Sequence, residues 1–234
     1  MRGSHTHFDE IETAFRKDDY SFETLRASYF ERTGDRLTDT DFVSFGLAKS
    51  DGLLTNAGVL LADQPILRQN RVFCTRWNGL DKAKVDGEVL DDQEYSGCLV
   101  KLLREAMDFV DRHNRVAWTK TDDDRIETPS YVMRAVEEAL VNALIHRRYE
   151  IGGAEVTVFD DRLEITSPGG KVDGMLPEDA DLGAIESVRR NPVIADLFQR
   201  DALHGAQRER PQAHTGAHRT RSELRGTVHA EIRR

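Results

Sequence analysis

The strongest constraint on the fold comes from the stretch Glu138 to Tyr149, which reads E-A-L-V-N-A-L-I-H-R-R-Y. Its apolar residues recur at helical spacing, so we expect a helix from Tyr131 to about His146. Glu138 and Asn142 are four residues apart and share one face of that helix. A carboxylate there can accept a proton from water, and the neighbouring amide oxygen can bind magnesium, as a nucleotide-hydrolysing site requires. An amphipathic helix with a solvated polar stripe gives the same pattern.

Composition narrows the functional classes. The chain has 234 residues, 38% of them hydrophobic and 32% charged, with a net charge of -9. This acidic balance argues against a wholly basic nucleic-acid binder, although it allows a local basic patch. Cys74 and Cys98 match no metal spacing and fit reduced thiols in a cytosol. No apolar run approaches the roughly 20 residues of a membrane span, and no secretion signal opens the chain. We therefore expect a cytoplasmic protein without a membrane segment.

The remaining pattern predicts mixed helices and strands. Helices are expected behind the caps Thr6, Ser21 and either Thr38 or Thr40, and over Leu53–Leu61, 93–113 and 192–198. Strands are expected at Arg71–Trp77, Ala154–Phe159 and Arg162–Thr166, with a hairpin of Val116–Lys120 and Arg125–Thr128 across the acidic turn Asp122–Asp124. This order is an α+β arrangement.

Three blocks carry a resemblance to a known family. They are Leu54–Leu61 (L-T-N-A-G-V-L-L), Glu138–Tyr149, and Asp161–Gly170 (D-R-L-E-I-T-S-P-G-G) followed by Arg190-Asn191-Pro192. Their order and spacing over about residues 1–200 resemble the RecG-like, Schlafen-related transcriptional regulators of bacteria and archaea. Members of that family join an AlbA-type DNA-binding domain to an ATP-binding domain related to the gyrase and histidine-kinase (GHKL) ATPases. The resemblance thus implies DNA as a partner and ATP and Mg²⁺ as cofactors.

The resemblance also implies roles for particular residues. Glu138 would be the general base, Asn142 the metal ligand, and His146 would lie near the phosphates unless it is structural. Gly169 and Gly170 would border the nucleotide, because glycines let backbone N–H groups approach a phosphate, although a turn that ends a strand is an equal alternative. The superfamily's D-x-G-x-G motif is missing after Asp161, so this chain lacks the residues by which the superfamily usually recognises adenine.

Both ends of the chain depart from the family. The segment Arg2-Gly3-Ser4-His5-Thr6 resembles the strand that ends the AlbA-type domain, with one position deleted. At the other end, residues 201–234 lack aromatic residues and a sustained apolar period. Back-translation of Asp201–His214, read one nucleotide later, permits M-R-Y-M-E and S-G-S-G-L-K-R-I, the family's usual continuation. We therefore predict a frameshift near Arg200; a disordered basic tail that touches nucleic acid is the alternative.

The expected fold is therefore α+β, with a helix-rich linking region and a GHKL-like (Bergerat-type) α/β sandwich that is incomplete at its C-terminal end. The expected domains are an AlbA-type remnant at 1–6, a linking region at 7–128, a partial ATP-binding domain at 129–200 and a disordered tail at 201–234. The predicted function is the ATP-binding module of a DNA-binding transcriptional regulator, with weak or no hydrolysis. The alternatives are a regulatory or dimerisation scaffold, a homodimer included, and a non-functional gene fragment. The helicase label has little support, because no G-x-x-x-x-G-K-[ST] loop is present.

Overall fold

The computed structural model describes residues 6–82, 87–120, 125–169, 189–199, 219–224 and 227–233. Its main feature is a six-stranded mixed sheet with the order β4-β3-β7-β8-β10-β9. The strands of this sheet are β3 (Arg71–Trp77), β4 (Val89–Ser96), β7 (Ala154–Val158), β8 (Arg162–Pro168), β9 (Arg219–Leu224) and β10 (Thr227–Arg233). Only the pairing of β3 with β7 is parallel among these neighbours. The predicted α+β class is confirmed.

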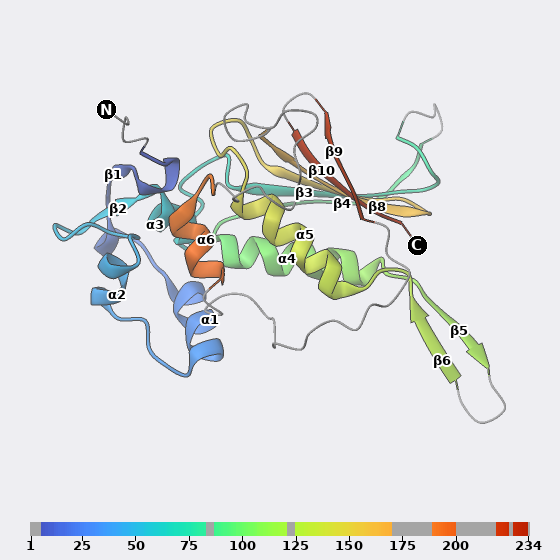
Figure 1. Ribbon diagram of the computed structural model, residues 1–234, viewed down its shortest axis with the longest axis horizontal. Helices are drawn as coiled ribbons and strands as arrows, with labels where there is room; N and C mark the ends of the chain where they lie inside the picture. Colours follow the sequence, from blue (N-terminus) through green and yellow to red (C-terminus); the bar gives the residue numbers. More distant parts are fainter. Residues whose placement is uncertain are drawn as a thin grey trace, which may run out of the picture.

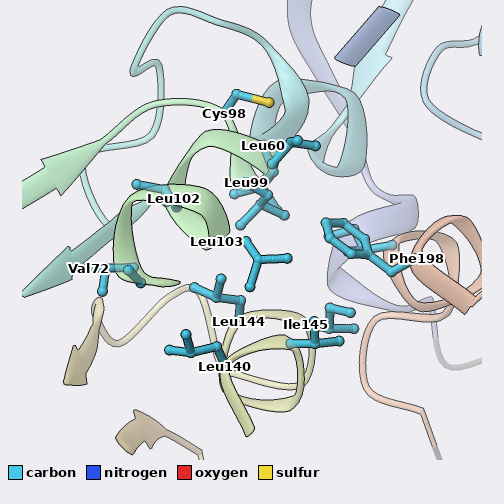
Figure 2. Packing of buried hydrophobic residues seen from close by; sticks show 14 of the residues in the cluster. Leu60, Val72, Cys98, Leu99, Leu102, Leu103, Leu140, Leu144, Ile145 and Phe198 are labelled. Carbon is cyan, nitrogen blue, oxygen red and sulfur yellow. The ribbon is translucent and has the colours of Figure 1, made fainter. Parts of the chain in front are cut away.

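Two long helices, α4 (Leu99–Arg112) and α5 (Met133–Ile145), cover one face of the sheet (Figure 1). Their apolar stripes meet the inward residues of β3, as Figure 2 shows for Leu102 and Leu144 around Val72. Burying such side chains contributes about 1.5–3 kcal/mol each. The opposite face of the sheet carries Phe73, which is 38% exposed, and the exposed Glu155.

A smaller N-terminal part packs beside the ends of these helices (Figure 1). Its elements are η1 (Phe8–Glu10), β1 (Glu12–Arg16), η2 (Lys17–Asp19), α1 (Glu23–Thr33), α2 (Asp39–Ser44), β2 (Leu53–Thr55) and α3 (Asn56–Leu61). Strands β1 and β2 pair antiparallel, and α6 (Pro192–Gln199) contacts η1. One hydrophobic cluster runs from Phe22 to Ile232, so this part shares its core with the sheet.

The structure crosses the predicted domain boundary at residue 128. Strands β3 and β4 lie in the segment 7–128 that we predicted to be a linking region, yet β3 pairs with β7 in the central sheet. Strands β5 (Val116–Lys120) and β6 (Arg125–Pro129) pair as the predicted hairpin, and this hairpin projects from the body (Figure 1). The acidic turn at residues 122–124 lies outside the described residues, as do residues 1–5 of the proposed AlbA remnant.

The described residues of the tail at 201–234, which we expected to be disordered, form strands. Residues 219–233 form the hairpin β9–β10, and β10 pairs with β8 from Thr227 opposite Pro168 to Arg233 opposite Arg162. The sequence of β10, T-V-H-A-E-I-R, alternates apolar and polar residues, and Ile232 is buried. We overlooked this strand period because the tail's composition is so polar. The frameshift itself stays a prediction, since it concerns the gene.

Three helix predictions are also corrected. Behind Thr6 the chain forms η1 and then β1 in place of one helix, and residues 53–55 form β2 before α3 begins. The predicted helix at 93–113 begins only at Leu99, because residues 89–96 pair with β3 as β4. Strand pairing with a distant segment overrides local propensity in these cases. Among the described residues, no helix combines the length and apolar character needed to cross a membrane.

The L-T-N-A-G block has a packing role. Thr55 caps α3, accepting from Gly58 N at 3.3 Å and donating to Gly46 O at 2.7 Å. A Cβ on Gly58 would fall less than 3.0 Å from the Leu47 carbonyl oxygen, which is backbone and cannot turn away.

Gly58→Ala should therefore lower the free energy of unfolding by about 1–3 kcal/mol through overpacking. Gly152→Ala is the control, because a Cβ there meets nothing within 4 Å. Denaturant unfolding of the two variants makes the comparison. Equal stability of both variants would show that the Leu47 segment yields freely.

Candidate nucleotide site at the end of helix α5

Helix α5 sets the direction of the predicted catalytic residues. Its core face is made of Val136, Leu140 and Leu144, which are all at most 1% exposed. Glu138 is exposed and Asn142 is half-buried on another face of the helix. The face that Glu138 and Asn142 share is therefore turned away from the core. Water and a ligand have access to Glu138 on that face.

The C-terminal end of α5 is capped by the R-N-P segment. Asn191 donates its amide Nδ2 to Ile145 O at 2.7 Å and to Arg147 O at 3.1 Å. Arg190 Nη1 donates to His146 O at 3.0 Å. These donors satisfy carbonyl groups that a helix end leaves unpaired. His146 is the half-buried C-cap residue of α5, and the role of its side chain stays a prediction.

Gly169 lies at the same end of α5. It follows β8, is buried, and has a φ of 118°, which favours glycine. A Cβ there would come within 3.0 Å of the guanidinium of Arg190 and of Arg148 Cγ. Arg148 N also donates to Pro168 O at 2.8 Å, which ties the segment after α5 to β8. His146 and Gly169 are thus brought together, whereas Gly170 lies outside the described residues.

These groups fit the chemistry of a magnesium-bound polyphosphate. Carboxylate and amide oxygens such as those of Glu138 and Asn142 are ligands that Mg²⁺ prefers. Guanidinium groups are a chemistry that suits phosphate, and those of the exposed Arg148 and the half-buried Arg190 lie near Gly169, whose missing Cβ lets a guanidinium reach the backbone. The described residues contain no group of three or more His, Cys, Asp or Glu that could hold a metal on its own. Two cavities found among them lie elsewhere, one against Arg76 and one against α6.

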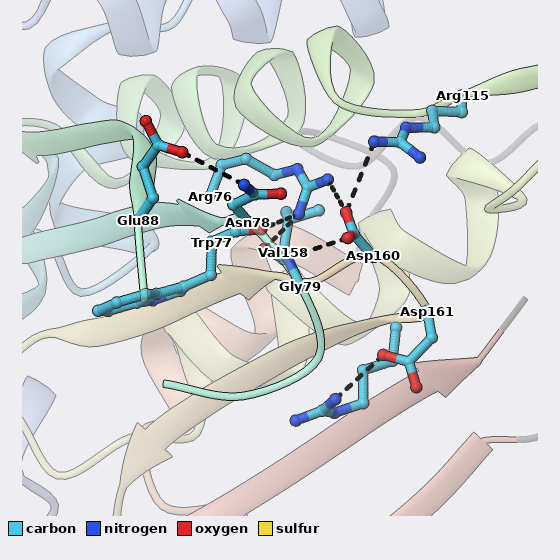
Figure 3. A network of polar contacts seen from close by, with 10 residues as sticks. Arg76, Trp77, Asn78, Gly79, Glu88, Arg115, Val158, Asp160 and Asp161 are labelled. Carbon is cyan, nitrogen blue, oxygen red and sulfur yellow. Dashed lines mark hydrogen bonds and ion pairs between the residues drawn. The ribbon is translucent and has the colours of Figure 1, made fainter. Parts of the chain in front are cut away.

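Asp161 lies away from this end. Its Oδ1 accepts from Arg162 Nη1 at 3.0 Å in the turn before β8, whereas Gly169 follows the last residue of that strand (Figure 3). The described residues of β8 that precede Gly169 include no aspartate, so the departure from the D-x-G-x-G pattern is also a difference in position.

A buried guanidinium that we did not single out lies behind the site. Arg147 is fully buried, and it donates to Asn70 Oδ1 at 2.7 Å and to Arg71 O at 2.9 Å. Its guanidinium stacks 4.4 Å from the ring centroid of Tyr149, which donates to Leu144 O at 2.7 Å. Burial lowers the pKa of Arg147 from its ordinary value and raises that of Tyr149 to about 12. The one feature of the sequence that points to Arg147 is its charge, in a position between an apolar helix and an apolar strand.

Asp9 holds the start of α6. The Asp9 side chain is buried, and its Oδ2 accepts from Ile194 N at 3.0 Å, while His7 Nδ1 lies 3.2 Å from Arg190 O. Burial raises the pKa of Asp9 to about 6, against the lowering effect of the α6 backbone N–H groups. Only the tertiary structure reveals this pairing, because 185 positions separate its two residues.

Part of the chain matches a known protein family. Residues 153–227, which hold β7, β8, α6 and β9, match the family described as "Putative ATP-dependent DNA helicase recG C-terminal". The predicted RecG-like resemblance is therefore confirmed over that segment, and the match continues past residue 200.

A solved structure shares the overall fold. The crystal structure of the DIP2311 protein from Corynebacterium diphtheriae matches with a TM-score of 0.72 and 20% identity over 98% of this chain. This chain spans about half of that protein, 48% of its length, and at this identity the likeness concerns the fold alone. No curated protein matches the sequence.

Replacing Arg147 by Met should lower the free energy of unfolding by about 2 kcal/mol, because it leaves Asn70 Oδ1 and Arg71 O without their buried donor. Arg134→Met on the exposed side of α5 should change it by less than about 0.5 kcal/mol. Urea unfolding measures both. A neutral Arg147→Met would mean that relief from burying the charge balances the lost hydrogen bonds.

Asp9 should make stability depend on pH. The pKa of Asp9 in the folded protein, about 6, exceeds the ordinary 3.8. The contribution of protonated Asp9 to the free energy of unfolding is therefore complete below pH 3.8 and is lost as pH rises through about 6. Between pH 4 and pH 8, wild type should therefore lose about 1–2 kcal/mol relative to Asp9→Asn. Chemical unfolding across that range tests this, with Asp18→Asn as the control because the Asp18 side chain is 83% exposed. Parallel pH profiles of wild type and Asp9→Asn would contradict the assignment.

Proposed function

We propose that the chain is an ATP-binding module with a GHKL-like α/β sandwich, in which the outward face of α5 and the Gly169 turn receive a magnesium-bound triphosphate. The observation that carries the proposal is the placement of Glu138 and Asn142, one turn apart on the outward face of α5. The family match begins at residue 153, shortly after this helix, and supports the same reading.

Each residue has a distinct task in this proposal. Glu138 accepts a proton from the attacking water, since its carboxylate is exposed at the surface of α5. Asn142 would hold Mg²⁺, which supplies charge neutralisation at the phosphoryl oxygens when it is bound. Arg148 and Arg190 would bind phosphate oxygens beside Gly169, where the lack of a Cβ lets both side chains pack close to the backbone. His146 stays at the end of this row, with its carbonyl held by Arg190.

The proposal extends to the regulator as a whole. ATP binding here would change how a DNA-binding domain of the same protein engages its target, and turnover would be weak. A non-catalytic scaffold that mediates dimerisation or transcriptional contacts is the second candidate. It is favoured by the position of both described cavities away from the outward face of α5.

Substitutions on α5 separate the two candidates. Glu138→Gln should keep ATP binding and lower turnover by about 10²–10⁴-fold, because the amide cannot accept the proton of water. Asn142→Ala should remove the magnesium-dependent part of ATP binding. Calorimetric titration of ATP with and without millimolar Mg²⁺, together with a phosphate-release assay, measures both effects.

Glu31→Gln is the matched control, because Glu31 is an exposed carboxylate on a different helix, α1. It should leave binding and turnover unchanged. If wild type binds no ATP at millimolar Mg²⁺, or if Glu138→Gln and Asn142→Ala behave like Glu31→Gln, the nucleotide proposal fails and the scaffold remains.

A further inference from the structure

A second polar site lies at the opposite end of β8 from Gly169. A cavity of about 230 Å³ opens there, between the end of β3, the start of β4 and the C-terminal end of α4. Its lining residues are Arg76, Leu90, Arg112, His113, Asn114 and Arg115. Arg76 precedes the last residue of β3 and pairs with Asp160 in the β7–β8 turn, whereas Gly169 follows the far end of β8 (Figure 3). The two sites are therefore separated by the length of that strand.

A buried guanidinium forms one wall of the cavity. Arg76 is only 4% exposed and is held by Val158 O at 3.3 Å, by Trp77 O and by an ion pair with Asp160. Asp160 is fixed in turn by Gly79 N at 2.9 Å. The Arg76 guanidinium, by its hydrogen bond, holds the pKa of Asp160 below its usual range. This wall is thus rigid, charged and already oriented.

The rim of the cavity carries two more guanidinium groups. The Arg112 and Arg115 side chains are 51% and 63% exposed, so they reach water. Their ion pairs are long, 3.7 Å from Arg112 to Asp91 and 3.5 Å from Arg115 to Asp160. His113 Nε2 lies closer to the same Asp91, at 2.9 Å. The lining of the cavity therefore holds three guanidinium groups and no carboxylate, in a chain whose net charge is -9, while Asp91 and Asp160 pair with these groups from beside the cavity.

Helix capping explains part of this cluster. Arg112 stands in the last turn of α4, where a cation offsets the negative end of the helix dipole. Capping does not account for Arg76, which comes from a strand, or for a solvent-open cavity with Leu90 as an apolar wall. Guanidinium groups bind phosphate through paired hydrogen bonds, and an apolar wall suits the organic part of an ester.

We infer that this cavity is a binding site for a small phosphate-class anion, either inorganic phosphate or the phosphate end of a small ester. The anion contacts Arg112 and Arg115 at the rim and approaches Arg76, where it competes with Asp160. The site is separate from the nucleotide site proposed on α5 and does not depend on it.

Titration of the full chain with inorganic phosphate, followed by calorimetry and by the rise in melting temperature, tests the inference. Arg112→Gln and Arg115→Gln should each weaken phosphate binding by about tenfold or more, because each removes a charged donor. Arg104→Gln is the control, since Arg104 is a 59% exposed arginine on the same helix. Because Arg104, Arg112 and Arg115 are on the surface, their Gln variants should fold, and circular dichroism verifies this.

Two further binding measurements test the inference. Asp160→Asn should tighten phosphate binding by removing the competing carboxylate, while Glu31→Gln, which changes an exposed carboxylate on α1, should leave it unchanged. A nucleoside monophosphate that binds more tightly than phosphate, with the same loss in Arg115→Gln, identifies an ester as the ligand. The inference is overturned if phosphate does not bind, if Arg104→Gln weakens binding as much as the rim variants, or if only duplex DNA responds to them.

Discussion

The buried guanidinium of Arg147 is the interaction on which the arrangement of this protein depends. It sits just past the end of α5 and donates to Asn70 and to the first residue of β3. Asn70 in turn donates to Leu60 O at 3.3 Å and to Gly97 O at 2.6 Å. One positive charge therefore joins α5, the start of the central parallel pair, α3 and the turn before α4. The hydrogen bonds from Nη1 and Nη2 offset part of the cost of burying this charge, so the backbone segments that they join are fixed relative to one another.

The end of α5 is held from a second direction by the chain that follows the sheet. Asn191 and Arg190 cap α5, Pro192 opens α6, and Asp9 receives the backbone N–H of Ile194. Proline suits the first position of a helix, and a carboxylate suits its positive end. As a result, the segment at His7–Glu10 is connected through α6 to the residues that surround Gly169. A change in the N-terminal segment would reach the arginines that we propose to bind phosphate beside Gly169 through two hydrogen-bonded steps, with no need for a long pathway.

Much of the fold could be predicted from the sequence, and the errors have a common cause. The helix around Glu138, the strand at Arg71–Trp77 and the hairpin after Val116 carry strong local periods, and each is confirmed. The misassigned segments, such as β1, β4 and β10, are strands whose partners lie far away in the chain or that read as polar. For the candidate site, the shared face of Glu138 and Asn142 follows from helix geometry alone. Arg147 and Asp9 could not be found this way, because their roles depend on long-range contacts and on burial.

The resemblance blocks divide into two kinds once their contacts are known. Gly58 in the first block leaves room for the Leu47 carbonyl, and Asn191 in the third caps α5, so packing and hydrogen bonding account for both. Glu138 and Asn142 differ, because the core contacts of α5 are made by other residues and these two stand on its outward face. Residues that serve the fold support a likeness in architecture, whereas polar residues placed outside the core bear on chemistry. The case for a nucleotide therefore rests on Glu138 and Asn142, and the family blocks around them explain why the helix that carries them is held so firmly.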